Sequence, residues 1–325
     1  MNKILIYSQV GMLGGSLRML YNLGKFLSID QHVTICLRGV TETVRKRLAW
    51  NQYFSLIAEQ ELPNKAKFDV ALFHLPFGGD EFLSKISFRH SALVVMEIQS
   101  RHTIQLSMQE AKNFQKVIYL HDEQLLSIQR LFKKNQCYLL PIINNVDFDL
   151  PFQKTDQIAS IGVWQYKHNM AKVLSILKNS ALKIKFKLYS ERPPTLRELG
   201  LMIPGYYYQA KVSKRLVFSG LEWNPAKIYS GFDCLLHLPS EGNGTSIVVS
   251  DALACGKLVV LSSLKGYKEA YSKFPGVHFI DDLGDNLGDL LQNFNKIESI
   301  AIKKEYQKHY CRSDVLMLWK ETLLS

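Results

Sequence analysis

Short runs of Val, Ile and Leu alternate along the whole chain with longer stretches that have the periodicity of amphipathic helices. In the first half the apolar runs are KILIYSQ, HVTICLRG, FDVALFHL, SALVVMEIQ, KVIYLHD and CYLLPIINN. Strands that are apolar along their whole length, separated by helical segments, are typical of parallel sheets covered by helices on both faces. The first half therefore predicts an α/β domain with a parallel sheet.

The alternation starts again in the second half, whose apolar runs are QIASIGVW, LKIKFKLYS, RLVFSG, CLLHLPS and KLVVLSS. Pro141 and Pro151 bracket a polar segment between the halves that breaks regular structure. We predict one α/β domain over residues 1–150, a second over 151–305, and a C-terminal helix over 306–325 that packs back on the first. Two such domains facing each other border one cleft, where ligands bind.

The chain is basic, with 40 Lys and Arg against 29 Asp and Glu, a net charge of +11. Such a surplus suits an anionic membrane surface, a nucleic acid or a phosphorylated substrate. No aromatic RNP-like or helix-turn-helix pattern accompanies it, so nucleic acid is not an expected partner. A basic and aromatic cluster over residues 45–54 fits either anionic lipid headgroups or a solvated helix whose aromatics pack inward.

The cysteines and the lengths of the apolar runs indicate in which cellular compartment the protein works. The five cysteines are scattered and form no CxxC pair, which argues against a disulfide framework or a structural zinc site. No apolar run approaches the roughly 18 residues that span a bilayer, and the opening MNKILIYSQVG is too short for a signal peptide. We expect a cytoplasmic protein, peripheral at the inner face of the membrane.

The segment over residues 239–257, PSEGNGTSIVVSDALACGK, predicts a short helix that begins after flexible glycines. Thr245 or Ser246 is the expected N-cap, and Gly256 is placed to end the helix. The free amides and positive dipole at such an N-terminus bind anions. Asp251 leans toward the same end and can accept both hydroxyls of a ribose. Alternatively, Asp251 caps a neighbour or forms an ion pair in an interdomain seam.

Several motifs follow one another in a fixed order along the chain: GMLGGSLRMLYNLGKFL, FDVALFHL with His74, LPIINNVDFD, IGVWQYKHN, FDCLLHLPS, NGTSIVVSDALACGKLVV and LKGYKE. In that order they resemble the motifs of the retaining GT-B glycosyltransferases of family 4, over nearly the whole chain. The resemblance implies two Rossmann-like domains across a cleft. It also implies transfer of a hexose-like sugar, with retention, from a UDP- or GDP-sugar to a glycan or lipid-linked acceptor in bacterial cell-surface polysaccharide or lipopolysaccharide synthesis.

The resemblance also assigns the two sides of the site. The acceptor lies at the first helix, and the donor lies at the helix that follows the glycines and at the cations before it. The residues so implied are Gly14, Gly15 and Ser16 for the acceptor, and Lys167, His168, Gly244, Thr245, Ser246 and Asp251 for the donor. Negative charge grows on the departing diphosphate, so charge stabilisation rather than a side-chain nucleophile is what the reaction needs.

The chain departs from the family at the catalytic positions. Where the family has Glu, seven residues and Glu, this chain has Asn243 and Asp251, with Glu241 two positions before Asn243. Either Asn243 binds the sugar as a neutral group, or Glu241 moves in, or catalysis is weak. The arginine of the diphosphate segment is Val163 here. These departures motivate an alternative, a non-catalytic GT-B partner subunit that binds a nucleotide-sugar.

A third catalytic position follows the run SALVVMEIQ, where the family often carries a histidine that reaches the transferred sugar. Here the position is Gln99, and Glu97, His102 and His121 lie nearby in the sequence, with no basis for choosing among them. DFD at residues 147–149 matches the metal-binding DxD of another glycosyltransferase fold, but its place in the linker makes this a coincidence. We expect no metal and no cofactor besides the co-substrate.

The glycines near the start also allow a dinucleotide-binding reading. Gly11, Gly14 and Gly15 do not follow the GxGxxG pattern, and the strand HVTICLRG ends without the acid that holds an adenosine ribose. A dehydrogenase is therefore not expected.

Overall fold

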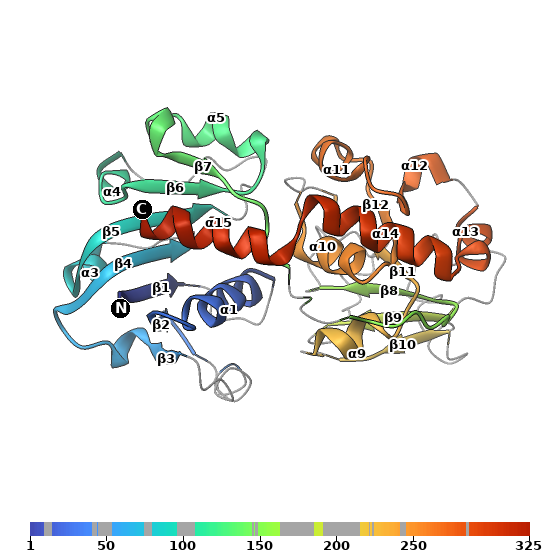
Figure 1. Ribbon diagram of the computed structural model, residues 1–325, viewed down its shortest axis with the longest axis horizontal. Helices are drawn as coiled ribbons and strands as arrows, with labels where there is room; N and C mark the ends of the chain where they lie inside the picture. The colour runs from blue at the N-terminus through green and yellow to red at the C-terminus, as the bar shows by residue number, and fades with distance from the viewer. Residues whose placement is uncertain are drawn as a thin grey trace, which may run out of the picture. The chain divides into compact units, whose positions relative to one another are not determined.

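The chain folds into two compact units, each with its own sheet (Figure 1). The first unit comprises Met1–Ile143 and Arg312–Ser325, and the second comprises Asn144–Cys311. This computed structural model describes residues 1–9, 15–40, 44, 54–74, 80–95, 108–144, 146, 149–162, 185–190, 215–220, 222, 224–240, 245–283 and 286–325.

The first unit contains a seven-stranded sheet of order β3-β2-β1-β4-β5-β6-β7, in which all neighbouring strands are parallel. The order reverses between β1 and β4, which is where doubly wound sheets form a ligand crevice. The strands are β1 Lys3–Ser8, β2 His32–Leu37, β3 Ser55–Ala58, β4 Ala66–His74, β5 Ile86–Val95, β6 Lys116–Tyr119 and β7 Cys137–Leu139.

Helix α15 (Arg312–Leu324) brings the end of the chain back to the first unit, where it contacts β4 and α1 (Figure 1). The indole of Trp319 is fully buried, and its Nε1 donates to the Pro141 carbonyl at 2.9 Å. Lys116 Nζ donates to the carbonyl of Thr322 at 2.8 Å. The other helices of this unit are α1 Gly15–Leu27, η1 Glu59–Glu61, α3 Asp80–Ser84, α4 Met108–Ala111, η2 Asp122–Gln124, α5 Leu125–Ile128 and η3 Lys134–Gln136.

The second unit contains a six-stranded parallel sheet of order β10-β9-β8-β11-β12-β13, which reverses between β8 and β11. The strands are β8 Gln157–Ile161, β9 Lys185–Tyr189, β10 Leu216–Phe218, β11 Cys234–His237, β12 Leu258–Leu261 and β13 Val277–Phe279. Strands β11 and β12 are buried along their whole length and are apolar apart from His237 at the end of β11. Two α/β units with parallel sheets are what the alternating apolar runs predict, and the structure confirms them.

Helices of the second unit include α10 (Ile247–Ala254), which connects β11 to β12, and α14 (Lys296–His309), which packs against it (Figure 1). The others are α9 Pro225–Tyr229, α11 Lys265–Tyr271, α12 Ile280–Leu283 and α13 Leu287–Asn293. Gly256 follows α10 with φ +68°, and the amide of Lys257 donates to the Ala252 carbonyl at 2.9 Å. This is the left-handed helix stop expected at Gly256.

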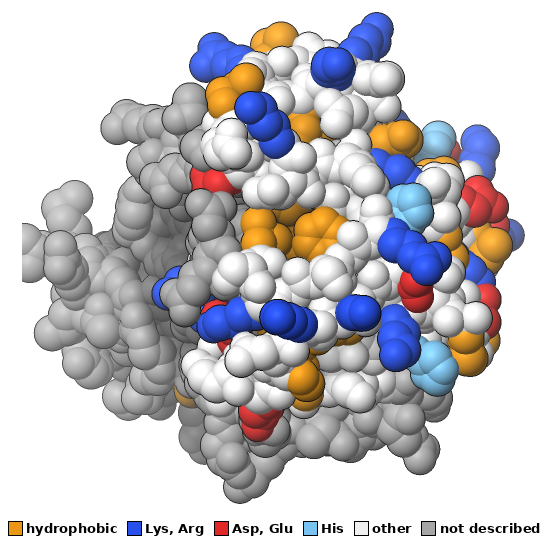
Figure 2. Space-filling model, turned by 90° about the vertical axis from the view of Figure 1, so that its left-hand side faces the viewer, with side chains coloured by type: hydrophobic (Ala, Val, Ile, Leu, Met, Phe, Trp, Pro, Cys, Tyr) orange, Lys and Arg blue, Asp and Glu red, His pale blue; other side chains and the backbone are white. Residues whose placement is uncertain are grey.

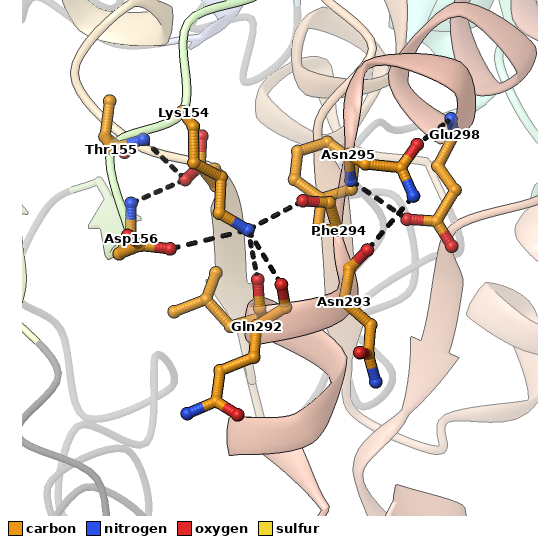
Figure 3. A network of polar contacts seen from close by, with 10 residues as sticks. Lys154, Thr155, Asp156, Gln292, Asn293, Phe294, Asn295 and Glu298 are labelled. Carbon is orange, nitrogen blue, oxygen red and sulfur yellow. Dashed lines mark hydrogen bonds and ion pairs between the residues drawn. The ribbon is translucent and has the colours of Figure 1, made fainter.

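A polar network joins α13 to α14 (Figure 3). Lys154 Nζ donates to the carbonyls of Leu291 at 2.5 Å and Phe294 at 2.6 Å, placing a cation at the C-terminal end of α13. Asn295 then caps α14 by accepting from the Glu298 amide at 3.2 Å, while Glu298 Oε2 accepts from the Asn295 amide at 3.1 Å. The contacts of Lys154 thereby fix the segment that follows Pro151 to the second unit.

The boundaries differ from the predicted ones. The second unit begins at Asn144 rather than 151, because Val146 joins its core and Asp149 forms an ion pair with Lys303. The predicted helix over 306–325 is interrupted, and its first residues stay in the second unit, because the rings of Tyr306 and Tyr310 pack on Phe274 there.

Candidate functional site

The strongest candidate site lies at the carboxyl edge of the second sheet, at its switch point. The neighbouring strands β8 and β11 end at Ile161 and His237, and the order of the sheet reverses between them. The chain leaves β11 at this edge and enters α10, so the N-terminus of α10 lies there too. Open α/β sheets bind their ligands at such a position.

The first turn of α10 contains amides that have no partner inside the helix. Ser246 is the N-cap, with extended backbone angles and no side-chain capping hydrogen bond. The amides of Ile247, Val248 and Val249 have no partner within the helix, since the first intrahelical bond runs from the amide of Ser250 to the carbonyl of Ser246 at 2.9 Å. These amides and the positive helix dipole favour an anion at this end.

The phenol of Tyr271, from α11, holds the N-cap. Its hydroxyl oxygen accepts from the Ser246 amide at 2.8 Å, and its hydroxyl donates to the Ser246 carbonyl at 3.2 Å. Burial raises the pKa of Tyr271 to about 12, although its hydrogen bonds to Ser246 and Ser250 act in the opposite direction. The hydroxyl is therefore protonated at neutral pH and can serve as a donor.

Asp251 lies in the middle of α10 with 1% of its surface exposed. The hydroxyl of Tyr229, at the end of α9, donates to Asp251 Oδ2 at 3.2 Å and also lies 3.4 Å from the Val248 carbonyl oxygen. The structure thus shows the contact with a neighbour, and this neighbour belongs to the same unit rather than to an interdomain seam. The contact of Asp251 with a ribose stays a prediction.

Three buried tyrosines surround α10, and their contacts were not predicted from the sequence. Tyr229, Tyr271 and Tyr306 come from three different helices, and each has 3% or less of its surface exposed. The signal in the sequence is a tyrosine at an inward position near the end of each amphipathic helix. That spacing predicts burial but does not show which group each hydroxyl contacts.

The structure places part of the predicted donor set. Thr245 and Ser246 are half-buried at the start of α10, and the N-cap is Ser246 rather than Thr245. The predicted residues that lie outside the described part of the chain are Gly14, Gln99, Lys167, His168, Glu241, Asn243 and Gly244, together with Glu97 and His102.

Two polar side chains lie at the switch point of the first sheet. Ser8 and His74 end the adjacent strands β1 and β4, and Ser8 Oγ lies 2.9 Å from His74 Nδ1. Burial lowers the pKa of His74 to about 4, so the imidazole is neutral at neutral pH. On the predicted acceptor side, Gly15 is the first residue of α1 and Ser16 follows it, although the Ser16 side chain is outside the described atoms.

His121, the remaining alternative for the catalytic position, is buried in the first unit just after β6. Its amide donates to Gln124 Oε1 at 3.2 Å, so its backbone is held by a local turn. His121 belongs to the first unit, whereas the described donor residues Thr245, Ser246 and Asp251 belong to the second.

Among the residues that the structure describes, no three His, Cys, Asp or Glu side chains gather to hold a metal ion. In the DFD segment, Asp149 pairs with Lys303, and Asp147 lies outside the described residues. No described helix has the length and apolar character that crossing a membrane requires.

The described surface mixes charges of both signs. Figure 2 shows the first unit from the side of the amino ends of its strands, where Lys and Arg side chains are interspersed with Asp and Glu. The side chain of Arg89, on β5, is 80% exposed, and its Nε lies 3.7 Å from Asp69 Oδ1. The basic and aromatic cluster over 45–54 falls almost entirely outside the described residues.

The two units, each with a switch point in a parallel sheet, define the GT-B fold. No protein-family model matches the chain, and no curated protein matches its sequence. Solved structures do match. HepE of Anabaena, in complex with UDP and glucose, is 12% identical with a TM-score of 0.72 over 99% of each chain.

TarM of S. aureus, in a mutant complex that contains UDP, is 11% identical with a TM-score of 0.72 over 100% of each chain. WaaG, a glycosyltransferase involved in lipopolysaccharide biosynthesis, is 12% identical with a TM-score of 0.65, over 98% of this chain and 99% of its own. These similar structures are GT-B glycosyltransferases. They confirm the predicted GT-B fold.

Proposed function

We propose that this protein is a retaining glycosyltransferase that moves a hexose-like sugar from a UDP- or GDP-sugar to a glycan or lipid-linked acceptor. The observation that carries the proposal is the N-terminus of α10, whose first-turn amides have no partner inside the helix, at the switch point of the second sheet. Similar structures with the same fold were solved with UDP or UDP-glucose bound, which supports a nucleotide-sugar donor.

The donor site has two parts in this proposal. The diphosphate lies against the first-turn amides of α10, beside Thr245 and Ser246, and the ribose hydroxyls contact Asp251. Lys167, His168 and Gly244 complete the diphosphate site. Charge builds up on the departing phosphate as the glycosidic bond breaks, and each well-placed donor there contributes roughly 3 kcal/mol to the lowering of the barrier.

The acceptor lies against the first unit, at the start of α1, with Gly14, Gly15 and Ser16 as its contacts. The neutral His74 and Ser8 end the two strands at the switch point of that sheet. The reaction needs neither a metal nor a side-chain nucleophile, and Asn243, Glu241 or Gln99 contacts the transferred sugar. We place the enzyme in the cytoplasm, at the inner face of the membrane, in the synthesis of a bacterial cell-surface polysaccharide or lipopolysaccharide.

The alternative of a non-catalytic partner subunit is not favoured by the comparisons, since WaaG is a glycosyltransferase. The two functions differ in one measurable outcome. An enzyme hydrolyses its donor slowly even without an acceptor, whereas a binding subunit leaves it intact.

The test is a calorimetric titration with UDP and GDP, followed by incubation with the sugar donors of whichever nucleotide binds. We expect one nucleotide to bind and its sugar donor to be hydrolysed slowly. Binding without hydrolysis or transfer would support the partner subunit, and absence of binding to either nucleotide would contradict the proposal.

A further inference from the structure

Tyr271 makes an unusual contact at the start of α10. Its hydroxyl is bonded to both backbone groups of a single residue, the amide of Ser246 at 2.8 Å and the carbonyl of Ser246 at 3.2 Å. Ser246 is the N-cap, where a side chain normally accepts from a first-turn amide, and the Ser246 side chain makes no such bond. A phenol from α11 therefore stabilises the point at which α10 begins.

This contact controls the peptide groups that lead into the first turn. The Ser246 carbonyl also accepts the first intrahelical hydrogen bond, from Ser250 at 2.9 Å. The backbone orientation of Ser246 thus determines the direction in which the next three amides point at the edge of the sheet. These are the amides of Ile247, Val248 and Val249. Preorganised donors bind and stabilise an anion better than donors that must first be ordered.

We propose that Tyr271 is a positioning residue of the donor site, which acts through Ser246 to hold the first-turn amides of α10 toward the diphosphate. The inference rests on the proposed function, because it takes the ligand at this helix end to be a nucleoside diphosphate. Tyr271 itself touches the N-cap and not the reacting atoms.

Tyr306 provides a matched control. It is as buried as Tyr271, and both rings pack on Phe274, with centroids 5.7 Å and 6.4 Å away. The hydroxyl of Tyr306 makes no hydrogen bond to Ser246 within the described residues, and it lies beside the side chains of Asn144 and Ser250. Tyr306→Phe therefore removes an equally buried hydroxyl from the same cluster without a bond to the N-cap.

The experiment compares UDP with uridine, which has the base and ribose but no phosphate. Both are titrated by calorimetry into the wild type, Tyr271→Phe and Tyr306→Phe. Tyr271→Phe should bind UDP about five- to tenfold more weakly, because the N-cap loses its hydrogen bonds to the phenol, and bind uridine as the wild type does. Tyr306→Phe should bind both like the wild type. Equal UDP affinity in Tyr271→Phe and the wild type would overturn the inference.

Hydrogen exchange without ligand gives an independent readout. The amides of Ser246 and Ser250, which are hydrogen-bonded at the N-cap, should exchange faster in Tyr271→Phe and at the wild-type rate in Tyr306→Phe, since only the first variant frees the N-cap. Unchanged exchange in Tyr271→Phe would overturn the positioning role. A wild type that binds neither UDP nor GDP would contradict the proposed function, and the exchange data would still decide whether Tyr271 holds the N-cap.

Discussion

At the scale of single residues, Asp251 combines a charge with an almost completely buried position. Its carboxylate accepts a hydrogen bond from the Tyr229 hydroxyl inside the second unit, which offsets part of the cost of burying a charge. The aspartate is one methylene shorter than the glutamate of the family pattern, and the Tyr229 contact holds it close to the helix. Its proposed second contact is the ribose of the donor.

Replacing Asp251 tests that contact. Asp251→Asn keeps the shape and still accepts from Tyr229, but it loses the charge, so UDP affinity should fall about tenfold or more. Calorimetry measures the change. Tyr229→Phe is the control, and it should mainly lower the free energy of unfolding, by about 1 kcal/mol. If Asp251→Asn binds UDP as tightly as the wild type, the ribose assignment is wrong.

His74 gives a prediction about pH. Burial lowers the pKa of His74 to about 4 from 6.5, so below pH 6.5 the unfolded chain takes up a proton that the folded chain does not. The stability that this residue contributes is complete above pH 6.5 and is lost as the pH falls toward 4. The loss amounts to about 2 kcal/mol near about pH 5.

Urea unfolding at about pH 7.5 and about pH 5 measures this difference. His74→Gln cannot titrate, so it should lose less stability than the wild type between the two values. His90→Gln, at an exposed position, should keep the wild-type pH dependence. Identical dependence in His74→Gln and the wild type would show that the imidazole does not titrate as described.

At the scale of elements, the position that follows α10 requires a glycine, Gly256, for two separable reasons. Its φ of +68° is unfavourable for other residues, and a Cβ built there would lie 2.4 Å from the Ser299 carbonyl oxygen on α14. Gly220 has the same φ of +68°, yet nothing lies within 4 Å of a Cβ built at that position. The two glycines separate the backbone effect from the packing effect.

We expect Gly220→Ala to lower the free energy of unfolding by about 1–2 kcal/mol, the cost of the left-handed backbone. Gly256→Ala should lower it further, because α14 must also move away from α10. Gly39→Ala, with open space and no positive φ, should have little effect. Chemical denaturation measures all three, and equal losses at Gly256 and Gly220 would mean that the contact with Ser299 contributes nothing.

Many of the strands and helix ends could be predicted from the sequence. The apolar runs KILIYS, HVTICL and KLVVL are strands because residues buried on both faces must be apolar throughout, and the glycine after ALAC is a helix stop. The contacts of Tyr229 and Tyr271 could not be predicted, since they join helices that are distant in the sequence. The helical pattern likewise continues from α14 toward α15 without showing that the two belong to different units.

At the scale of the whole molecule, the two units differ in the number of chain segments that form them. The second is one uninterrupted segment, whereas the first needs the last fourteen residues, Arg312–Ser325, to complete it. Trp319 is the fully buried anchor of that return. The first unit can therefore be complete only after residues 312–325 have been made.

Trp319→Ala should consequently destabilise the first unit alone. Removing a buried aromatic side chain costs about 3–5 kcal/mol, so calorimetric unfolding should show one transition shifted to lower temperature and the second-unit transition unchanged. Met317→Ala, on the same helix with 44% of its surface exposed, is the control. Equal shifts of both transitions in Trp319→Ala would contradict the independence of the two units.

The central claim is that the N-terminus of α10 binds the diphosphate of the donor, and hydrogen exchange with and without UDP or GDP tests it most directly. We predict that the nucleotide that binds will slow exchange of the amides over residues 245–251. Binding that protects other segments and leaves α10 unchanged would contradict the claim.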